Sequence, residues 1–254
     1  MREISTNTIK ETVKKLYLQE NYYIGQDILH ALQEGLQKEE SETGRAILKQ
    51  IIENNQLAAK EQLAICQDTG MAVLFIKLGQ DVRIVDGDFN EAVNQGVREA
   101  YAEGYLRKSL VTDPLYDRKN TKDNTPAVIH LELVPGEKIH FLVTGKGFGS
   151  ENMSRLKMMA PAEGEQGVRN FVVETVKMAG PNPCPPVIVG VGIGGTVDKA
   201  AQMAKKATLR PLGTHNPDPR YAKLETEILE EINKLGIGPG GLGGRVTALG
   251  VNID

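Results

Sequence analysis

The chain has 254 residues, enough for one large domain or two small ones with a sizeable buried core. With 40% hydrophobic and 25% charged residues its composition is that of a soluble globular protein, and a net charge of −3 does not suggest the basic face of a nucleic-acid binder. The longest apolar runs, such as 71–76 and 186–191, are too short to cross a bilayer, and the N-terminus lacks the apolar core of a signal peptide. We therefore expect a cytoplasmic protein that binds neither nucleic acid nor membrane.

Helices are predicted for most of the first sixty residues. Apolar residues recur at helical spacing from Ile9 and again from Ile28, and a third helix is expected at about 41–60. After this region the pattern changes to short apolar runs separated by turn residues. We therefore divide the chain into a helical N-terminal part, residues 1–60, and a mixed α/β part, residues 61–254, which together are expected to form one continuous domain.

The mixed part is predicted to contain a β-hairpin. Apolar and polar residues alternate from Ile129 to Leu133, and Pro135-Gly136 separates this strand from an apolar run at 139–143. The polar stretch 112–125 is predicted to be a long loop. Other strands are expected at 71–78, 82–85, 186–191 and 246–253, and helices at 89–101, 168–176, 198–209 and 221–235. Helices followed by mixed strands and helices predict an α+β fold with a mixed sheet.

Two segments place chemically useful groups around the only two cysteines. In Cys66-Gln67-Asp68-Thr69-Gly70 a thiol, an amide, a carboxylate and a hydroxyl stand in succession before a strand. Cys66 can be a buried thiol that behaves as a small hydrophobe, or a metal ligand. Cys184 stands among three prolines that favour extended, rigid backbone, which suits a metal ligand and a plain loop cysteine equally. Two cysteines are too few for a secreted disulfide scaffold.

Two glycine-rich segments allow more than one interpretation. Residues 145–152 can offer backbone N–H groups to an anion or form a tight turn. Residues 190–195 fit the G-x-G-x-x-G dinucleotide fingerprint between a strand and a helix. Against that reading, the expected acidic residue should end a second strand about 20 positions further on, but residues 212–218 there are predicted to be a loop, and the second strand of the unit is missing. A glycine-loop nucleotide-binding module is therefore an alternative of another class.

Several isolated polar residues are expected to be structural. His215 is expected to cap or buttress its loop, and His130 and His140 to be exposed or satisfied structural residues. Six acidic residues are expected on solvated faces or as helix caps: Asp86, Asp88, Glu225, Glu227, Glu230 and Glu231.

Taken together, seven segments resemble class I fumarases and L-tartrate dehydratases, specifically the alpha subunit of the two-subunit forms. These segments are ICQDTGMAVLFI, LRKSLVTDPL, NTPAVIH, GKGFGSENMSRL, NPCPPVIVGVGIGGTVDKAA, PLGTHNP and GGLGGRVTALGVNID. CQDTG, and GVGIGGT with the upstream CPP, are the most specific. The resemblance covers essentially the whole chain and favours an enzyme.

The resemblance implies an iron–sulfur hydro-lyase. The expected reaction is the reversible hydration of fumarate to L-malate, with dehydration of L(+)-tartrate as the alternative. A 4Fe-4S cluster held by three cysteines is implied, and Cys66 and Cys184 match two of them. The family's third cysteine lies in a segment beyond Asp254, so we expect that the chain is truncated at its C-terminus. A non-catalytic scaffold that has lost the third ligand is a further alternative.

The resemblance also implies roles for individual residues. Asp68 matches an acid/base or substrate-orienting carboxylate, Gln67 a substrate hydrogen-bonding amide, and Arg107 a carboxylate-binding arginine. Gly147 and Gly149 match positions whose backbone N–H groups face the substrate. The remaining proton-transfer residues of the family belong to a beta subunit. We therefore expect a small dicarboxylate substrate, activity only with a beta partner, and homodimerisation of the alpha chain.

Overall fold

The computed structural model describes all residues from Met1 to Asp254, and their contacts group the chain into two compact units. Unit 1 comprises Met1–Ile24 and Asn55–Phe148; unit 2 comprises Gly25–Asn54 and Gly149–Asp254. Each unit is thus built from two separate stretches of sequence. The predicted division of the chain into residues 1–60 and 61–254 is a different partition and stays a prediction.

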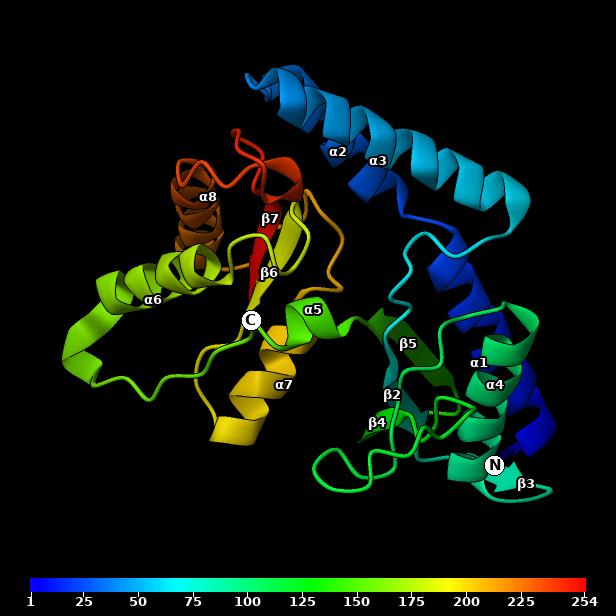
Figure 1. The fold of residues 1–254 in the computed structure, drawn as a ribbon. Helices are drawn as coiled ribbons and strands as arrows, with labels where there is room; N and C mark the ends of the chain where they lie inside the picture. The colour runs from blue at the N-terminus through cyan, green and yellow to red at the C-terminus, as the bar shows by residue number, and fades with distance from the viewer. The chain divides into compact units, whose positions relative to one another are not determined.

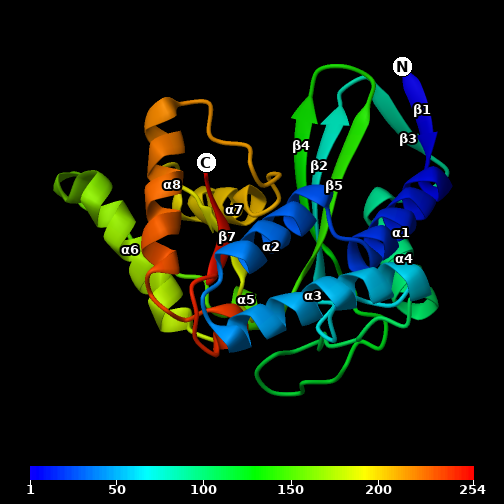
Figure 2. The same ribbon diagram turned by 90° about the horizontal axis from the view of Figure 1, so that it is seen from above.

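Unit 1 contains a three-stranded sheet in which β2 is the central strand (Figure 2). Strand β4 pairs with β2 in parallel and β5 pairs with it in the antiparallel sense. The predicted hairpin is therefore wrong, because both predicted strands exist but neither pairs with the other. The five residues from Ala72 to Ile76 are all buried, as a central strand requires, whereas Leu131 and Leu133 of β4 are exposed at the sheet edge. The strands of this sheet are β2 (Met71–Gly79), β4 (Val128–Val134) and β5 (Ile139–Lys146).

Two helices cover one face of this sheet. Helices α1 (Thr6–Tyr22) and α4 (Phe89–Glu103) lie side by side (Figure 1) and bury Val13, Val97 and Leu74 in a common core. Asp88 caps α4 by accepting a hydrogen bond from the Glu91 N–H at 2.7 Å, which confirms its predicted capping role. A small parallel pair, β1 (Arg2–Ser5) and β3 (Val82–Val85), completes unit 1; β3 was predicted and β1 was not.

Unit 2 is built around the parallel pair β6 (Val187–Val191) and β7 (Ala248–Ile253). No second strand was expected for the βαβ unit of the glycine fingerprint. Strand β7 is such a strand, because it follows α7 along the chain and pairs with β6 in parallel. The unit's buried apolar core includes Val176, Ile228 and Ile253. Its helices are α2 (Gln26–Lys38), α6 (Gly164–Ala179), α7 (Val197–Ala207) and α8 (Pro219–Asn233). Helix α3 (Glu42–Glu61) and the short α5 (Phe148–Glu151) contribute residues to both units. Two short 3-10 helices lie at Pro161–Glu163 and Pro239–Gly241. The helices and the mixed sheet confirm the α+β class.

Two glycines of the fingerprint allow α7 to lie directly on β6. A Cβ atom at Gly190 would lie 2.0 Å from the carbonyl oxygen of Ala204, and one at Gly192 would lie 2.2 Å from that of Ala200. No side chain fits such gaps, so the close approach of helix and strand requires glycine at both positions. This packing accounts for two of the three fingerprint glycines without a nucleotide.

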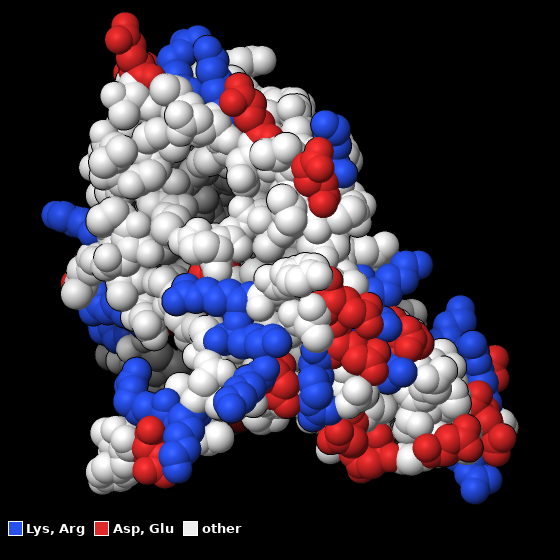
Figure 3. Space-filling view, turned by 45° about the vertical axis from the view of Figure 1, so that its right-hand side comes forward, with Lys and Arg blue, Asp and Glu red and all other residues white.

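None of the helices combines the length and the apolar character that a membrane span needs. On the face drawn in Figure 3, basic and acidic side chains are interspersed with one another. The polar stretch predicted as a loop has turns and bends, with an isolated bridge between Val111 and Asn120 as its only regular pairing.

Candidate functional site

The loop that carries Cys66 presents its thiol to solvent. Cys66 is a free, exposed cysteine, so the alternative of a buried thiol is wrong. The backbone N–H of Asp68 points at the Cys66 sulfur, 3.4 Å away, and Gln67 beside it is exposed. The thiolate is the form of cysteine that binds metal, and this loop presents the sulfur to solvent.

Asp68 connects this loop to the start of the next glycine segment. Its Oδ1 accepts a hydrogen bond from the Gly70 N–H at 3.1 Å, and its Oδ2 accepts one from the Phe148 N–H at 3.0 Å. Gly70 has φ +69°, and a Cβ there would lie 2.4 Å from the carbonyl carbon of Lys146. Only glycine permits this contact. A Cβ at Gly147 would lie 3.3 Å from Asp68 Oδ2, so two of the predicted site segments, 66–70 and 145–152, meet at one carboxylate.

Arg107 is held at this loop by its backbone. Its N–H donates to Thr69 Oγ1 at 3.0 Å, and Thr69 is buried. The Arg107 side chain is exposed and forms no ion pair with another residue, and neither does that of the adjacent Lys108. A guanidinium without a carboxylate partner beside the Asp68 loop can bind an anionic ligand through its planar donors.

A buried polar network under the loop was not found from the sequence. The hydroxyls of Tyr17 and Tyr101 lie 2.7 Å apart; Tyr17 donates to the Thr69 carbonyl at 3.0 Å and Tyr101 to that of Gly70 at 2.5 Å. Asn124, fully buried, donates to the same Gly70 carbonyl at 3.0 Å. Burial raises the pKa of both tyrosines, so they stay neutral donors. In the sequence Tyr17 belongs only to the helical pattern that begins at Ile9, although a tyrosine hydroxyl that becomes buried needs a partner.

Glu20 fixes the end of β5 that precedes Gly147. Its Oε1 accepts hydrogen bonds from the Gly145 N–H at 2.9 Å and the Thr144 hydroxyl at 3.3 Å. Burial raises the pKa of Glu20, and these hydrogen bonds only partly oppose the increase. No pattern in the sequence distinguished this residue from the other acidic residues of the N-terminal helices.

In unit 2, Cys184 is also a free, exposed thiol. Its φ is +56°, so the extended backbone expected from the neighbouring prolines is wrong at this residue. A turn follows α6 instead, in which the Cys184 N–H donates to the Pro181 carbonyl at 3.0 Å. Gly149 lies beside this loop, because a Cβ on it would be 3.0 Å from the Asn182 carbonyl oxygen.

The chemistry of the donors fits a thiolate-bound cluster in part. Exposed thiols on loops fixed by backbone hydrogen bonds, as at Cys66 and Cys184, are suitable soft ligands for iron. These two thiols are the chain's whole supply, and no three or more His, Cys, Asp or Glu side chains gather into a metal site. The residues present therefore supply two of the three thiolates that the resemblance implies.

Comparison with known proteins agrees with the motifs. The chain matches the family described as "Fumarate hydratase (Fumerase)" over residues 10–254. It is 43% identical over 252 residues to "Putative L(+)-tartrate dehydratase subunit alpha" of Methanocaldococcus jannaschii, covering 97% of this chain and 88% of that protein. It is 33% identical over 255 residues to L(+)-tartrate dehydratase subunit alpha of Escherichia coli K12, covering 100% of this chain and 84% of that protein. The resemblance seen in the sequence is confirmed, and the chain belongs to the fumarate hydratase (Fumerase) family.

Proposed function

We propose that the chain is the alpha subunit of an iron–sulfur hydro-lyase that adds water to, or removes it from, a small dicarboxylate. The family and the dehydratase relatives indicate a hydro-lyase. The observation that carries the assignment of the site is the meeting of Asp68, the Gly147 segment and the backbone of Arg107 in unit 1. Carboxylate, amide and guanidinium groups in one place suit a ligand with carboxylate and hydroxyl groups.

Two substrates are proposed. Reversible hydration of fumarate to L-malate is the reaction suggested by the family, and dehydration of L(+)-tartrate is suggested by the names of the relatives that are 33–43% identical. The two substrates differ in the number of hydroxyl groups, which an enzyme distinguishes by hydrogen bonds that only one of them can satisfy. Rates on both, measured with the same preparation, decide between them.

The proposed cofactor is a 4Fe-4S cluster with Cys66 and Cys184 as two of its ligands. The third thiolate comes from outside the 254 residues, because the chain has two cysteines in all. When bound, such a cluster supplies an iron with open positions that acts as a Lewis acid toward the substrate. Thiolate is the ligand form, and the Asp68 N–H fixes the position of the Cys66 sulfur within its loop.

The chain's own residues then bind and orient the substrate. Arg107 binds one carboxylate through paired N–H donors, and the exposed Gln67 amide hydrogen-bonds the substrate. Asp68 orients the substrate or transfers a proton, and the backbone amides of Gly147 and Gly149 hold a substrate oxygen. The relatives are named alpha subunits, which supports a beta subunit as partner; homodimerisation of the alpha chain is part of the same proposal.

The decisive variant is Asp68→Asn in the enzyme assembled with its partner. Asparagine keeps one acceptor oxygen, so it retains one of the two backbone hydrogen bonds and should cost about 1 kcal/mol of stability. If Asp68 handles a proton, kcat falls about 10²-fold or more while iron content stays unchanged. The matched control is Asp113→Asn, because the half-buried Asp113 also accepts two backbone hydrogen bonds, from the Leu115 and Tyr116 N–H groups of its own turn. Equal kcat in the two variants would refute the role of Asp68.

A further inference from the structure

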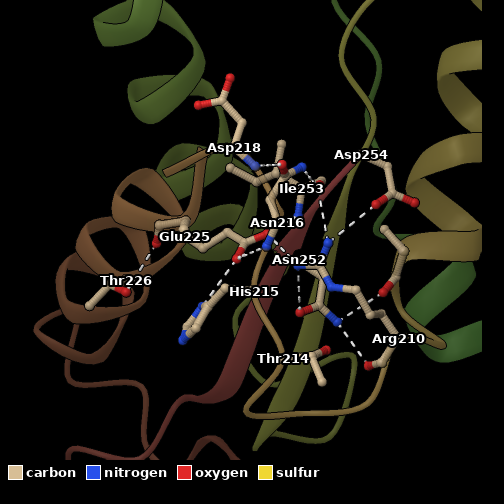
Figure 4. Close-up of polar contacts among 12 residues, drawn as sticks. Arg210, Thr214, His215, Asn216, Asp218, Glu225, Thr226, Asn252, Ile253 and Asp254 are labelled. Carbon is tan, nitrogen blue, oxygen red and sulfur yellow. Dashed lines mark hydrogen bonds and ion pairs between the residues drawn. The ribbon is translucent and has the colours of Figure 1, made fainter. Parts of the chain in front are cut away.

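The Glu225 cluster of unit 2 is a structural network (Figure 4). Glu225 was expected on a solvated face, and that expectation is wrong, because its side chain is 1% exposed. Its Oε1 accepts hydrogen bonds from the Ile253 N–H at 2.8 Å and from the Arg210 guanidinium, and its Oε2 accepts one from the Asn216 N–H at 3.2 Å. His215 Nδ1 lies 3.2 Å from Oε2, which confirms that this histidine supports its own loop. The cluster fastens the loop after α7 to β7, and this role accounts for its residues.

The outer edge of β4 in unit 1, by contrast, has backbone groups without partners. Strand β4 pairs only with β2, without a bulge, so its other side is a free edge of the sheet (Figure 2). The Gln80 N–H donates to the Val134 carbonyl at 2.8 Å, so Val134 directs its backbone groups toward β2. Backbone groups alternate in direction along a strand. Three residues of β4 therefore direct their N–H and C=O groups out of the sheet edge, where no group of the chain bonds them: Ile129, Leu131 and Leu133.

The side chains of this edge are apolar and exposed. Leu131 is 54% and Leu133 67% exposed, although both lie on the same face as Ile129, which packs against the core under α1 and α4. The other edge strand, β5, is protected, because three of its apolar side chains pack against that core and Glu20 accepts a hydrogen bond from the Gly145 N–H at 2.9 Å. Edge strands are usually blocked by lysine, proline or a bulge, and β4 contains none of these. Such an edge is suited to pairing with another strand.

The sequence of β4 is complementary to itself in the antiparallel sense. When Leu131 lies opposite Leu131 of a second copy, Ile129 lies opposite Leu133, and His130 lies opposite Glu132, each twice by two-fold symmetry. The outward backbone groups then meet as hydrogen-bonded pairs, and His130 and Glu132 meet as non-hydrogen-bonded pairs, in which side chains are closer. Apolar pairs and an imidazole beside a carboxylate are favourable cross-strand neighbours. Centring the axis on either neighbouring residue would instead set Glu132 against Glu132 or His130 against His130.

We propose that two copies of this chain dimerise through β4, so that their sheets join into one sheet across a two-fold axis at Leu131. This inference rests on the proposed function, which included homodimerisation without naming a surface. A two-fold axis perpendicular to the sheet keeps α1 and α4 of both copies on the same face. Leu131 and Leu133, exposed in the single chain, are then covered by the second copy. A second copy fits better than an unrelated strand, because the edge matches itself in both its apolar and its polar pairs.

The first test measures the mass of the purified chain by sedimentation velocity. We expect the wild type to sediment as two chains. Leu131→Lys and Leu131→Glu should each sediment as one chain, with the dissociation constant raised about tenfold or more, because like charges meet at the axis. An equal mixture of these two variants should recover the dimer, because opposite charges then face each other. Leu115→Lys is the matched control and should stay dimeric, since Leu115 is 70% exposed in a loop of the same unit.

Three outcomes of this experiment would overturn the proposal. The wild type sediments as a single chain, the two Leu131 variants stay dimeric, or their mixture stays monomeric. The mixture is the sharpest of the three, because residue 131 faces its own copy only when the axis passes through it. A dimer in another register would not be restored by mixing the two charges.

The second test reads the pairing directly and does not depend on activity. Hydrogen exchange followed by NMR should show slowly exchanging Ile129, Leu131 and Leu133 amides in the wild type, and fast exchange at these positions in Leu131→Lys. The His130 and Glu132 amides point at β2 and should exchange slowly in both, which shows that the variant is folded. A dimer with fast outward amides, or protection that appears only when a beta subunit is added, would overturn the proposal. Absence of hydratase activity would refute the proposed reaction and leave these measurements unchanged.

Discussion

Replacement of Glu39 by glutamine should destabilise unit 2. Among the acidic residues of this unit other than Glu225, we expect Glu39 to be the one whose conversion to the amide costs the most stability. Glu39 directly follows α2 and is only 2% exposed. Its Oε1 accepts hydrogen bonds from the Glu40 and Ser41 N–H groups, both at 2.9 Å. Its Oε2 accepts bonds from the Arg245 N–H at 2.9 Å and the Val246 N–H at 2.8 Å, which belong to the segment before β7.

The expected size follows from these four donors. A glutamine side chain has one acceptor oxygen. With that oxygen in the Oε1 position the Glu40, Ser41 and Arg245 N–H groups keep an acceptor, because the Arg245 N–H also lies 3.0 Å from Oε1, and the Val246 N–H loses its own. A buried donor left unsatisfied costs about 1–3 kcal/mol. In a protein of this size 1 kcal/mol shifts the thermal midpoint by about 2–4 °C, so we expect a decrease of roughly 2–12 °C.

The assay is denaturant and thermal unfolding of Glu39→Gln beside Glu40→Gln. Glu40 is the neighbouring residue with the same side chain, but it is 70% exposed and only pairs with Arg245 at 3.0 Å. Its replacement should change the free energy of unfolding by less than about 0.5 kcal/mol. If the two variants unfold alike, the backbone hydrogen bonds of Glu39 do not stabilise the fold and the reasoning fails.

The same carboxylate makes stability depend on pH. Burial tends to raise the pKa of Glu39, but its four backbone donors lower it below its ordinary value of 4.5. The unfolded state therefore binds this proton first as the pH falls, and the stabilisation present above pH 4.5 is lost as the pH falls through the lower pKa of the folded state. Urea unfolding between pH 7 and about pH 3 should show a smaller loss of stability in Glu39→Gln than in the wild type; equal slopes would contradict this.

Three further outcomes are expected. Tyr17→Phe removes the hydroxyl that bonds the Thr69 carbonyl and should cost about 1–2 kcal/mol in unfolding experiments, whereas Tyr116→Phe, at a residue 82% exposed, should cost almost nothing. Gly192→Ala should destabilise the packing of α7 on β6 by about 1–3 kcal/mol, and an unchanged midpoint would show that the helix can move aside without cost. Serine in place of Cys66 or Cys184 should lower the iron content of the reconstituted assembly, and full iron content in both variants would remove them as ligands.

The local elements could be predicted from sequence, but their partners could not. The unbroken apolar run of β2 identified a strand because its residues are buried on both faces, and the pattern of Val93, Val97 and Tyr101 identified α4. The hairpin prediction failed because a turn signal at Pro135-Gly136 says that the chain reverses, not which strand lies beside it. The strand β1 is four residues long, too short for its period to be visible.

In the candidate site, too, local features could be predicted from the sequence but long-range partners could not. Motifs led to Gln67, Asp68 and Arg107, because each of them stands among recognisable sequence neighbours. The half-buried Glu20 was missed and the buried Glu225 was assigned to the surface, because what holds a carboxylate away from solvent is a set of donors elsewhere in the chain. Glu20 accepts from a residue 125 positions away, and Glu225 from one 28 positions away. A single sequence does not show such pairings.

The interleaving of the two units has a consequence for synthesis on the ribosome. Residues 25–54 emerge early but belong to the unit that is completed by residues 149–254. They therefore cannot pack in their unit until those later residues have been made, whereas unit 1 can fold once residue 148 has emerged. Glu39 meets its Val246 partner only after 207 further residues have been made. During that interval α2 and the first part of α3 expose apolar surface that has no partner yet, and non-local closure of this kind is slow. A chaperone that binds nascent chains would be expected to hold this segment, and translation that slows after residue 148 would lengthen its exposure without affecting unit 1.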